Sequence, residues 1–70
     1  MNWDEIHGNW SLFKGEIKER WGKLTDDDMD VIEGERDQLI GTLQKRYGMS
    51  KEQAQMEVED YVNGVTYNRR

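Results

Sequence analysis

Carboxylates crowd into one short segment of the chain. Residues 26–37 hold seven acidic side chains against a single base, Arg36, which leaves six net negative charges. Four of the acids stand at positions 1, 3, 5 and 12 of an EF-hand calcium loop: Asp26, Asp28, Asp30 and Asp37. Position 6 of such a loop needs a glycine and is Val31 here, and position 12 is normally the longer Glu. We therefore expect no calcium site in this segment.

Two roles remain open for the acidic segment. Carboxylates in the first turn of a helix complement its dipole and satisfy free backbone amides, while the others form a solvated face. Alternatively, the segment is an acidic patch that binds a protein partner. The residues of this candidate patch are Asp27, Asp28, Asp30, Glu33, Glu35 and Asp37.

The other reactive side chains form no recognisable catalytic or cofactor site. His7 is the only histidine, and the chain has no cysteine. A hydroxyl such as that of Ser11 needs a base, an orienting group and an oxyanion site in a shielded pocket, which 70 residues can hardly enclose. The glycines are spread along the chain rather than clustered in a phosphate-binding loop. We expect no enzyme activity, no catalytic residue, no cofactor, no metal and no small-molecule substrate.

Nucleic acid and membranes are also unfavourable partners. Basic residues cluster between Lys14 and Lys23, but a sequence pI near 4.7 opposes the approach of phosphates. No run of apolar residues exceeds two, which is too short for a membrane span or the core of a signal peptide. We expect neither kind of partner, and a cytoplasmic location.

Length and composition predict one small folded domain of marginal stability. The chain has 70 residues, 36% of them charged, and a net charge of only -5. Leu, Ile, Val and Phe make up less than a fifth of the residues, a level at which chains become prone to disorder. Three Trp and three Tyr supply large apolar surfaces that favour a folded core. Without cysteines, folding must rest on packing alone.

Apolar spacing predicts four helices over residues 9–21, 26–33, 35–47 and 51–62. In the first, aromatic and aliphatic residues recur at steps of three and four and form one face: Trp10, Phe13, Ile17, Trp21 and Leu24. This pattern places Trp10 and Trp21 in the core. Trp3 lies outside the periodicity and either folds back onto the bundle or contacts a partner. No alternating β-branched run predicts a strand, so the expected class is all-α.

Glycines and hydroxyl residues mark the expected helix ends. Gly22 and Gly48 each follow the last aromatic residue of a helix, where a left-handed glycine commonly ends it. Thr25 and Ser50 then stand where an N-cap hydroxyl is expected, each with a side-chain acceptor three residues later.

The glycines also indicate an internal repeat. They recur at seven-residue steps in two triplets, and shifting the chain by 26 residues superposes them. The shift also matches Phe13 with Leu39 and Ile32 with Val58. We interpret the repeat as two related helical hairpins. Gly15 and Gly41 lie inside helices, where each costs about 1 kcal/mol relative to Ala, so we predict a close helix crossing there.

Several motifs together resemble the CsbD-like family of small bacterial stress proteins. They include Asn9-Trp10, the string from Trp21 to Asp28, Ile32-Glu33-Gly34 and Arg46-Tyr47-Gly48. The resemblance implies a small bundle of two crosswise-packed hairpins with four to five helices, similar to the sterile-alpha-motif arrangement. It also implies a role in the general stress response and no catalytic residue. His7, where an acidic residue is expected, and residues 63–70 depart from the family pattern.

Residues 1–62 are thus expected to form a single CsbD-like domain and residues 63–70 a flexible tail. Two function classes remain. The first is a non-enzymatic interaction module that binds a protein partner or a second copy of itself. The second is a hydrophilin-like protectant that acts through hydration and abundance, which the mean hydropathy of -1.09 favours.

Overall fold

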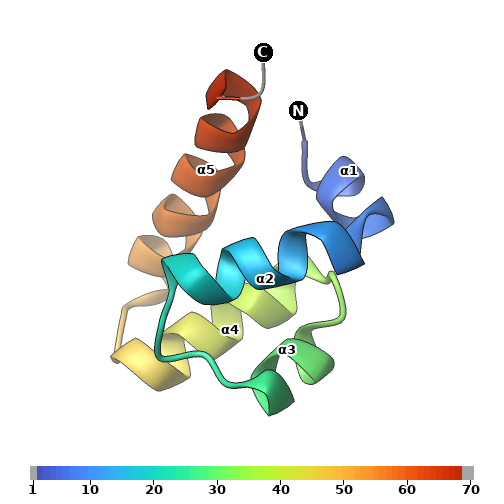
Figure 1. Ribbon diagram of the computed structural model, residues 1–70. Helices are drawn as coiled ribbons and strands as arrows, with labels where there is room; N and C mark the ends of the chain where they lie inside the picture. Colours follow the sequence, from blue (N-terminus) through green and yellow to red (C-terminus); the bar gives the residue numbers. More distant parts are fainter. Residues whose placement is uncertain (1, 69–70) are drawn as a thin grey trace.

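Five helices make up the part of the chain that the structure describes. The computed structural model describes the backbone of residues 2–68 and the side chains of residues 2–64. The helices are α1 (Trp3–Gly8), α2 (Trp10–Arg20), α3 (Asp26–Ile32), α4 (Arg36–Tyr47) and α5 (Lys51–Asn68). In Figure 1, α5 rises steeply past one end of α2 and α4, and the two termini lie at the same end of the molecule. The predicted all-α fold and small helical bundle are confirmed.

The core takes apolar side chains from every helix and from the connection between α2 and α3. α4 packs most extensively against α5, and then against α3. The buried side chains are Ile6, Phe13, Ile17, Trp21, Leu24, Met29, Ile32, Leu39, Ile40, Leu43, Ala54, Val58 and Tyr61. The apolar face predicted for the first helix is therefore correct, except that Trp10 is only half-buried at the edge of the core.

The helix ends follow the predicted caps in part. Thr25 caps α3 and accepts a hydrogen bond from the backbone of Asp28, and Ser50 accepts one from the backbone of Gln53. Gly48 ends α4 with a φ of 67°, as predicted. The prediction for Gly22 is wrong, because the positive φ angles in the described residues belong to Glu33, Gly34 and Gly48. The chain instead leaves α2 through a turn in which the Leu24 backbone N–H donates to the Trp21 carbonyl at 3.0 Å, without a left-handed residue.

The predicted helix crossing at Gly15 and Gly41 is also wrong. A Cβ atom added at either glycine would meet nothing within 4 Å. Both residues are exposed, so no neighbouring backbone requires a glycine at these positions.

Both ends of the bundle differ from the expected helix limits. The spacing of apolar residues did not predict α1, a helix of six residues whose start is capped by the side chain of Asn2. α5 runs to Asn68 rather than ending at residue 62, because Gly64 is accommodated within the helix and no proline stops it. The last two residues of the expected tail lie outside the described residues, and the division at residue 62 stays a prediction.

Candidate functional site

The acidic segment begins at a fully formed helix cap. The Thr25 hydroxyl accepts a hydrogen bond from the Asp28 backbone at 3.1 Å, and the Thr25 backbone donates to the Asp28 carboxylate at 3.0 Å. This reciprocal capping box satisfies free amides at the start of α3. Asp28 therefore points back along its own helix rather than into solvent.

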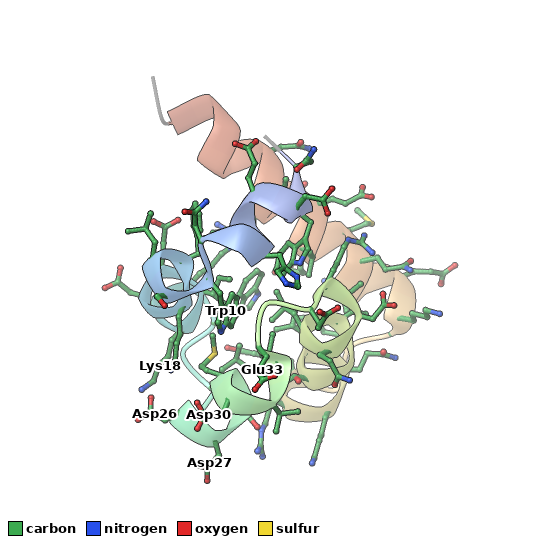
Figure 2. All side chains as sticks on the ribbon, turned by 90° about the vertical axis from the view of Figure 1, so that its right-hand side faces the viewer. Trp10, Lys18, Asp26, Asp27, Asp30 and Glu33 are labelled. Carbon is green, nitrogen blue, oxygen red and sulfur yellow. The ribbon has the colours of Figure 1, made fainter. Side chains whose placement is uncertain are left out.

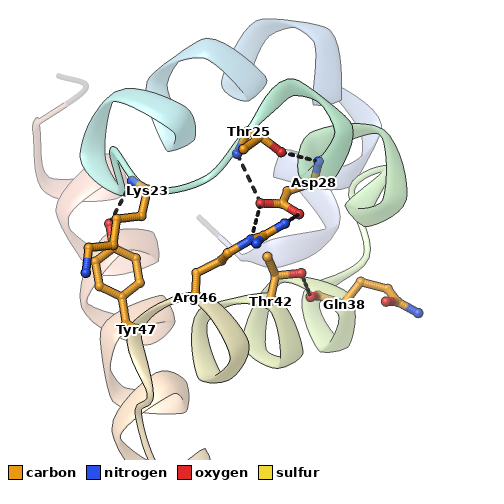
Figure 3. Close-up of polar contacts among 7 residues, drawn as sticks. All are labelled: Lys23, Thr25, Asp28, Gln38, Thr42, Arg46 and Tyr47. Atoms are coloured by element: carbon orange, nitrogen blue, oxygen red, sulfur yellow. Dashed lines mark hydrogen bonds and ion pairs between the residues drawn. The ribbon is translucent and has the colours of Figure 1, made fainter.

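The same Asp28 carboxylate joins α3 to α4. Figure 3 shows the Arg46 guanidinium donating to both of its oxygens, at 2.7 and 2.8 Å. Only 12% of the Asp28 side chain is exposed, so this bidentate ion pair is partly shielded from water. The hydrogen bonds from Arg46, followed by the one from the Thr25 backbone, lower the pKa of Asp28 well below its usual range. The carboxylate in turn raises the pKa of Arg46.

Two further aspartates face lysines on α2. Lys18 forms a hydrogen-bonded ion pair with Asp26, and Lys14 lies 3.6 Å from Asp30. The hydrogen bond and positive charge of Lys18 lower the pKa of Asp26. Figure 2 shows Lys18 and Asp26 on the same side of the molecule. Much of the charge that the sequence gathers in one segment is thus balanced by bases from other helices.

The acidic segment also contacts α1. Glu35 lies 3.6 Å from the His7 ring, and the Trp3 indole donates a hydrogen bond of 2.7 Å to the Gly34 carbonyl. Gly34 has a φ of 80°, and a Cβ added there would lie 3.5 Å from the His7 Cα and from the Trp10 side chain. Of the two roles left open for Trp3, the structure shows the one in which it folds back onto the bundle.

Three carboxylates of the segment form no ion pair within the described part of the chain: Asp27, Glu33 and Asp37. All three are exposed, and Figure 2 shows Asp27 pointing away from the bundle. Between Asp27 and Glu33 lies Val31, whose side chain is 64% exposed. We call Asp27, Val31, Glu33 and Asp37 the outer acidic surface. Its three carboxylates are the members of the predicted patch that are both exposed and without an ion pair among the described residues.

Comparison with known proteins decides the family. The family model described as CsbD-like matches residues 4–56, which is most of the chain. The chain belongs to the CsbD-like family. It is 64% identical to the UPF0337 protein YjbJ of Escherichia coli K12 over 61 residues, covering 87% of this chain and 88% of that protein. Identity to YjbJ of Salmonella typhimurium is 66% over 67 residues, covering 96% of each.

A third relative shows a similar degree of identity. The UPF0337 protein RPA4217 of Rhodopseudomonas palustris is 61% identical over 61 residues, covering 87% of this chain and 92% of that protein. The predicted resemblance is therefore confirmed. Membership of the CsbD-like family makes this chain a bacterial stress-response protein, and it names no reaction.

The described residues of this CsbD-like chain contain neither a cluster of metal-ligating side chains nor a membrane-spanning helix. Across residues 2–68, no three His, Asp or Glu side chains converge on a point that could hold a metal ion. Three of the four aspartates in the calcium-loop pattern have basic partners: Asp26, Asp28 and Asp30. No helix in the same range is long and apolar enough to cross a membrane.

The sequence did not indicate which basic side chains pair with some carboxylates of the acidic segment and leave others unpaired. Arg46 lies 18 residues from Asp28, and nothing in their spacing indicates that they meet. The signal that existed was the N-cap at Thr25, which fixes where the Asp28 carboxylate points. The matching base could be identified only once α4 was placed beside α3.

Proposed function

We propose that this CsbD-like chain is a non-enzymatic protein-interaction module of the bacterial cytoplasm, and that the outer acidic surface is its binding face. The proposal rests on one observation. Asp27, Glu33 and Asp37 form no ion pair within the described residues, whereas Asp26, Asp28 and Asp30 of the same segment pair with lysine or arginine side chains. With exposed Val31 among them, they suit a partner segment that carries both basic and apolar side chains.

The conformation of Glu33 supports this proposal. Its φ of 46° and ψ of 37° are left-handed, a region that residues with long side chains rarely adopt. Gly or Asn would make the same bend with less strain. An exposed carboxylate at a strained position suggests that the side chain serves a purpose other than shaping the bend.

The environments of the titrating groups support a non-enzymatic role. The carboxylates with lowered pKa values, Asp26 and Asp28, are held by bases on neighbouring helices. A catalytic acid or base is instead expected in a cleft, with its pKa brought near the working pH. His7 is about half exposed and faces Glu35 at the surface, which does not resemble a shielded catalytic pair.

The composition favours a second candidate, a hydrophilin-like protectant. With 36% charged residues, the chain is strongly hydrated and could shield other proteins through abundance alone. The packed core argues for the interaction module, because a protein that acts only through hydration needs no fixed fold.

The deciding experiment compares two triple variants. Asp27→Asn, Glu33→Gln and Asp37→Asn neutralise the outer acidic surface. Glu19→Gln, Glu52→Gln and Asp60→Asn remove the same charge from exposed positions elsewhere and serve as the matched control. Each protein is used to capture partners from a lysate of stressed bacteria at low and moderate salt.

An interaction module predicts a defined basic partner that is captured by the parent and the control. The outer-surface variant should lose it, and raised salt should weaken it. Capture of a second copy would be detected by sedimentation in the same buffers. If both triple variants capture the same proteins, the outer acidic surface is not the binding face and that part of the proposal fails. If all three proteins protect a dried enzyme equally and capture nothing, the protectant replaces the interaction module.

A single substitution sharpens the test. Glu33→Asn should relieve backbone strain and leave the protein at least as stable as the parent, while binding weakens. Increased stability with undiminished binding would show that Glu33 has no role in recognition.

A further inference from the structure

The methionines of the chain differ widely in their access to solvent. Met56 on α5 is 66% exposed, whereas Met29 on α3 is fully buried. Met49, between α4 and α5, is half-buried against the core. Because the chain has no cysteine, methionine thioethers are its oxidisable sulfur groups.

Met56 also borders a surface groove. The groove has a volume of about 320 Å³ and lies along the first half of α5, lined by Ser50, Glu52, Gln53, Met56, Glu57 and Asp60. It is large enough to admit a small oxidant beside the sulfur. Since Met56 lies outside the core, converting it to the polar sulfoxide removes no buried contact.

The charges around Met56 select among oxidants. Glu52 and Asp60 are each one helical turn away from Met56, on the same side of α5, and Glu57 is its neighbour in sequence. The Cβ atoms of residues one helical turn apart lie about 5–6 Å from each other. These carboxylates therefore repel an anion that approaches Met56 within the screening length of about 8–10 Å. An uncharged peroxide is not repelled.

We propose that Met56 is a modification site, oxidised to methionine sulfoxide by uncharged peroxides while the protein stays folded. The thioether sulfur attacks one peroxide oxygen, an S–O bond forms and the O–O bond breaks. With hydrogen peroxide, the second oxygen leaves as water after taking up a proton. The sulfur is oxidised by two electrons, and the peroxide is reduced by the same two. A methionine sulfoxide reductase reaction would be needed to restore the thioether.

Peptide mapping tests the site directly. Trypsin places the four methionines on separate peptides: 1–14, 24–36, 47–51 and 52–69. After brief treatment of the folded protein with hydrogen peroxide, we expect the peptide of Met56 to gain one oxygen at least about tenfold faster than the peptide of Met29. Met49 should fall between them, and the peptide of Met1 is followed separately.

The fold must survive the modification. Protein singly oxidised at Met56 should keep its helical circular dichroism and its melting temperature. Met56→Leu should remove the fast oxidation without changing the fold, and Met49→Leu is the matched control that keeps it. Equal oxidation rates at Met56 and Met29 in the folded protein, or unfolding on oxidation of Met56, would overturn the proposal.

The choice of oxidant has its own test. Peroxymonosulfate, an anion, should oxidise Met56 faster as salt rises, and Asp60→Asn should have the same effect at low salt. The hydrogen peroxide rate should change in neither case, with a blocked methionine amide correcting for salt effects on the chemistry itself. The same salt response for both oxidants would contradict the selection for uncharged peroxides.

Discussion

The two halves of the internal repeat share buried apolar positions in α2 and α4 and differ in the partners of their polar residues. Shifted by 26 residues, α2 (Trp10–Arg20) covers residues 36–46, which lie within α4 (Arg36–Tyr47). Ile17 and Leu43, at equivalent positions, are both fully buried. The equivalent arginines have different partners. Arg20 lies over the rings of Trp21 and Tyr61, at 5.3 and 5.6 Å, whereas Arg46 binds Asp28.

The difference shows that a repeated sequence pattern predicts burial but not the partners of polar side chains. A buried aliphatic side chain needs only to face inward, so the same spacing gives the same result twice. The hydrogen bonds and ion pairs of a polar side chain depend on which atoms lie nearby, and each half of the repeat faces different neighbours. Trp21, for example, donates a hydrogen bond of 3.2 Å to Glu57, whereas the equivalent Tyr47 accepts one of 3.1 Å from the Lys23 backbone.

The largest loss of stability is expected from substitutions at the buried positions that the two halves of the repeat share. Ile17→Ala and Leu43→Ala should each lower the free energy of unfolding by roughly 2–5 kcal/mol, because each leaves a cavity in the same core. Urea denaturation measures both, with Leu12→Ala as the control, since Leu12 is 66% exposed. A cost below about 1 kcal/mol at either buried site would mean that the two halves do not share the core equally.

Substitutions at the glycines that follow α2 and α4 should change stability in opposite directions. Gly48→Ala should destabilise the protein by about 1 kcal/mol, because Gly48 has a φ of 67°. Gly22→Ala should be neutral or stabilise by up to about 1 kcal/mol, since its backbone is not left-handed and the new methyl meets nothing within 4 Å. Thermal melts of the two variants give the comparison. Equal losses would restore the symmetric capping that the sequence predicted.

The two hydroxyl N-caps should differ modestly in how much they stabilise the protein. Thr25→Ala and Ser50→Ala should each cost about 1 kcal/mol, since each removes an acceptor for a helix-start amide. Thr25→Ala should cost more, because it also breaks the capping box that orients Asp28 toward Arg46. Chemical denaturation at neutral pH checks the order. A larger loss at Ser50 would argue that the capping box contributes little to stability.

The smallest expected effect concerns the loss of stability at low pH. Because the pKa of Asp28 is lowered in the folded state, its ion pair stabilises the protein above the unfolded pKa near 3.8. That contribution falls progressively as pH drops below about 5, because the unfolded chain then binds a proton at Asp28 that the folded protein does not. Unfolding followed from pH 7 to pH 2 should therefore show a shallower loss for Asp28→Asn than for the parent. Arg20→Gln leaves this ion pair intact and should keep the parent's pH profile.

The helices of the repeat could be predicted from sequence because their signals are local. The limits of α2 and α4 were correct to within one residue, since apolar spacing and end residues act over a few positions. α1 has only six residues, too few for a period to emerge. It is held by burial of Ile6 and by the hydrogen bond from Trp3 to Gly34, both of which depend on distant parts of the chain.

The sequence by itself determined the helical class, the buried face of α2, the caps at Thr25 and Ser50 and the family. These follow from periodicity and from hydrogen bonds between residues close in the chain. Only the tertiary structure decided which carboxylates of residues 26–37 are held by Lys14, Lys18 and Arg46 and which form the outer acidic surface. An ion pair depends on distances of a few ångströms between separate helices, and those distances exist only once the core has packed the helices together.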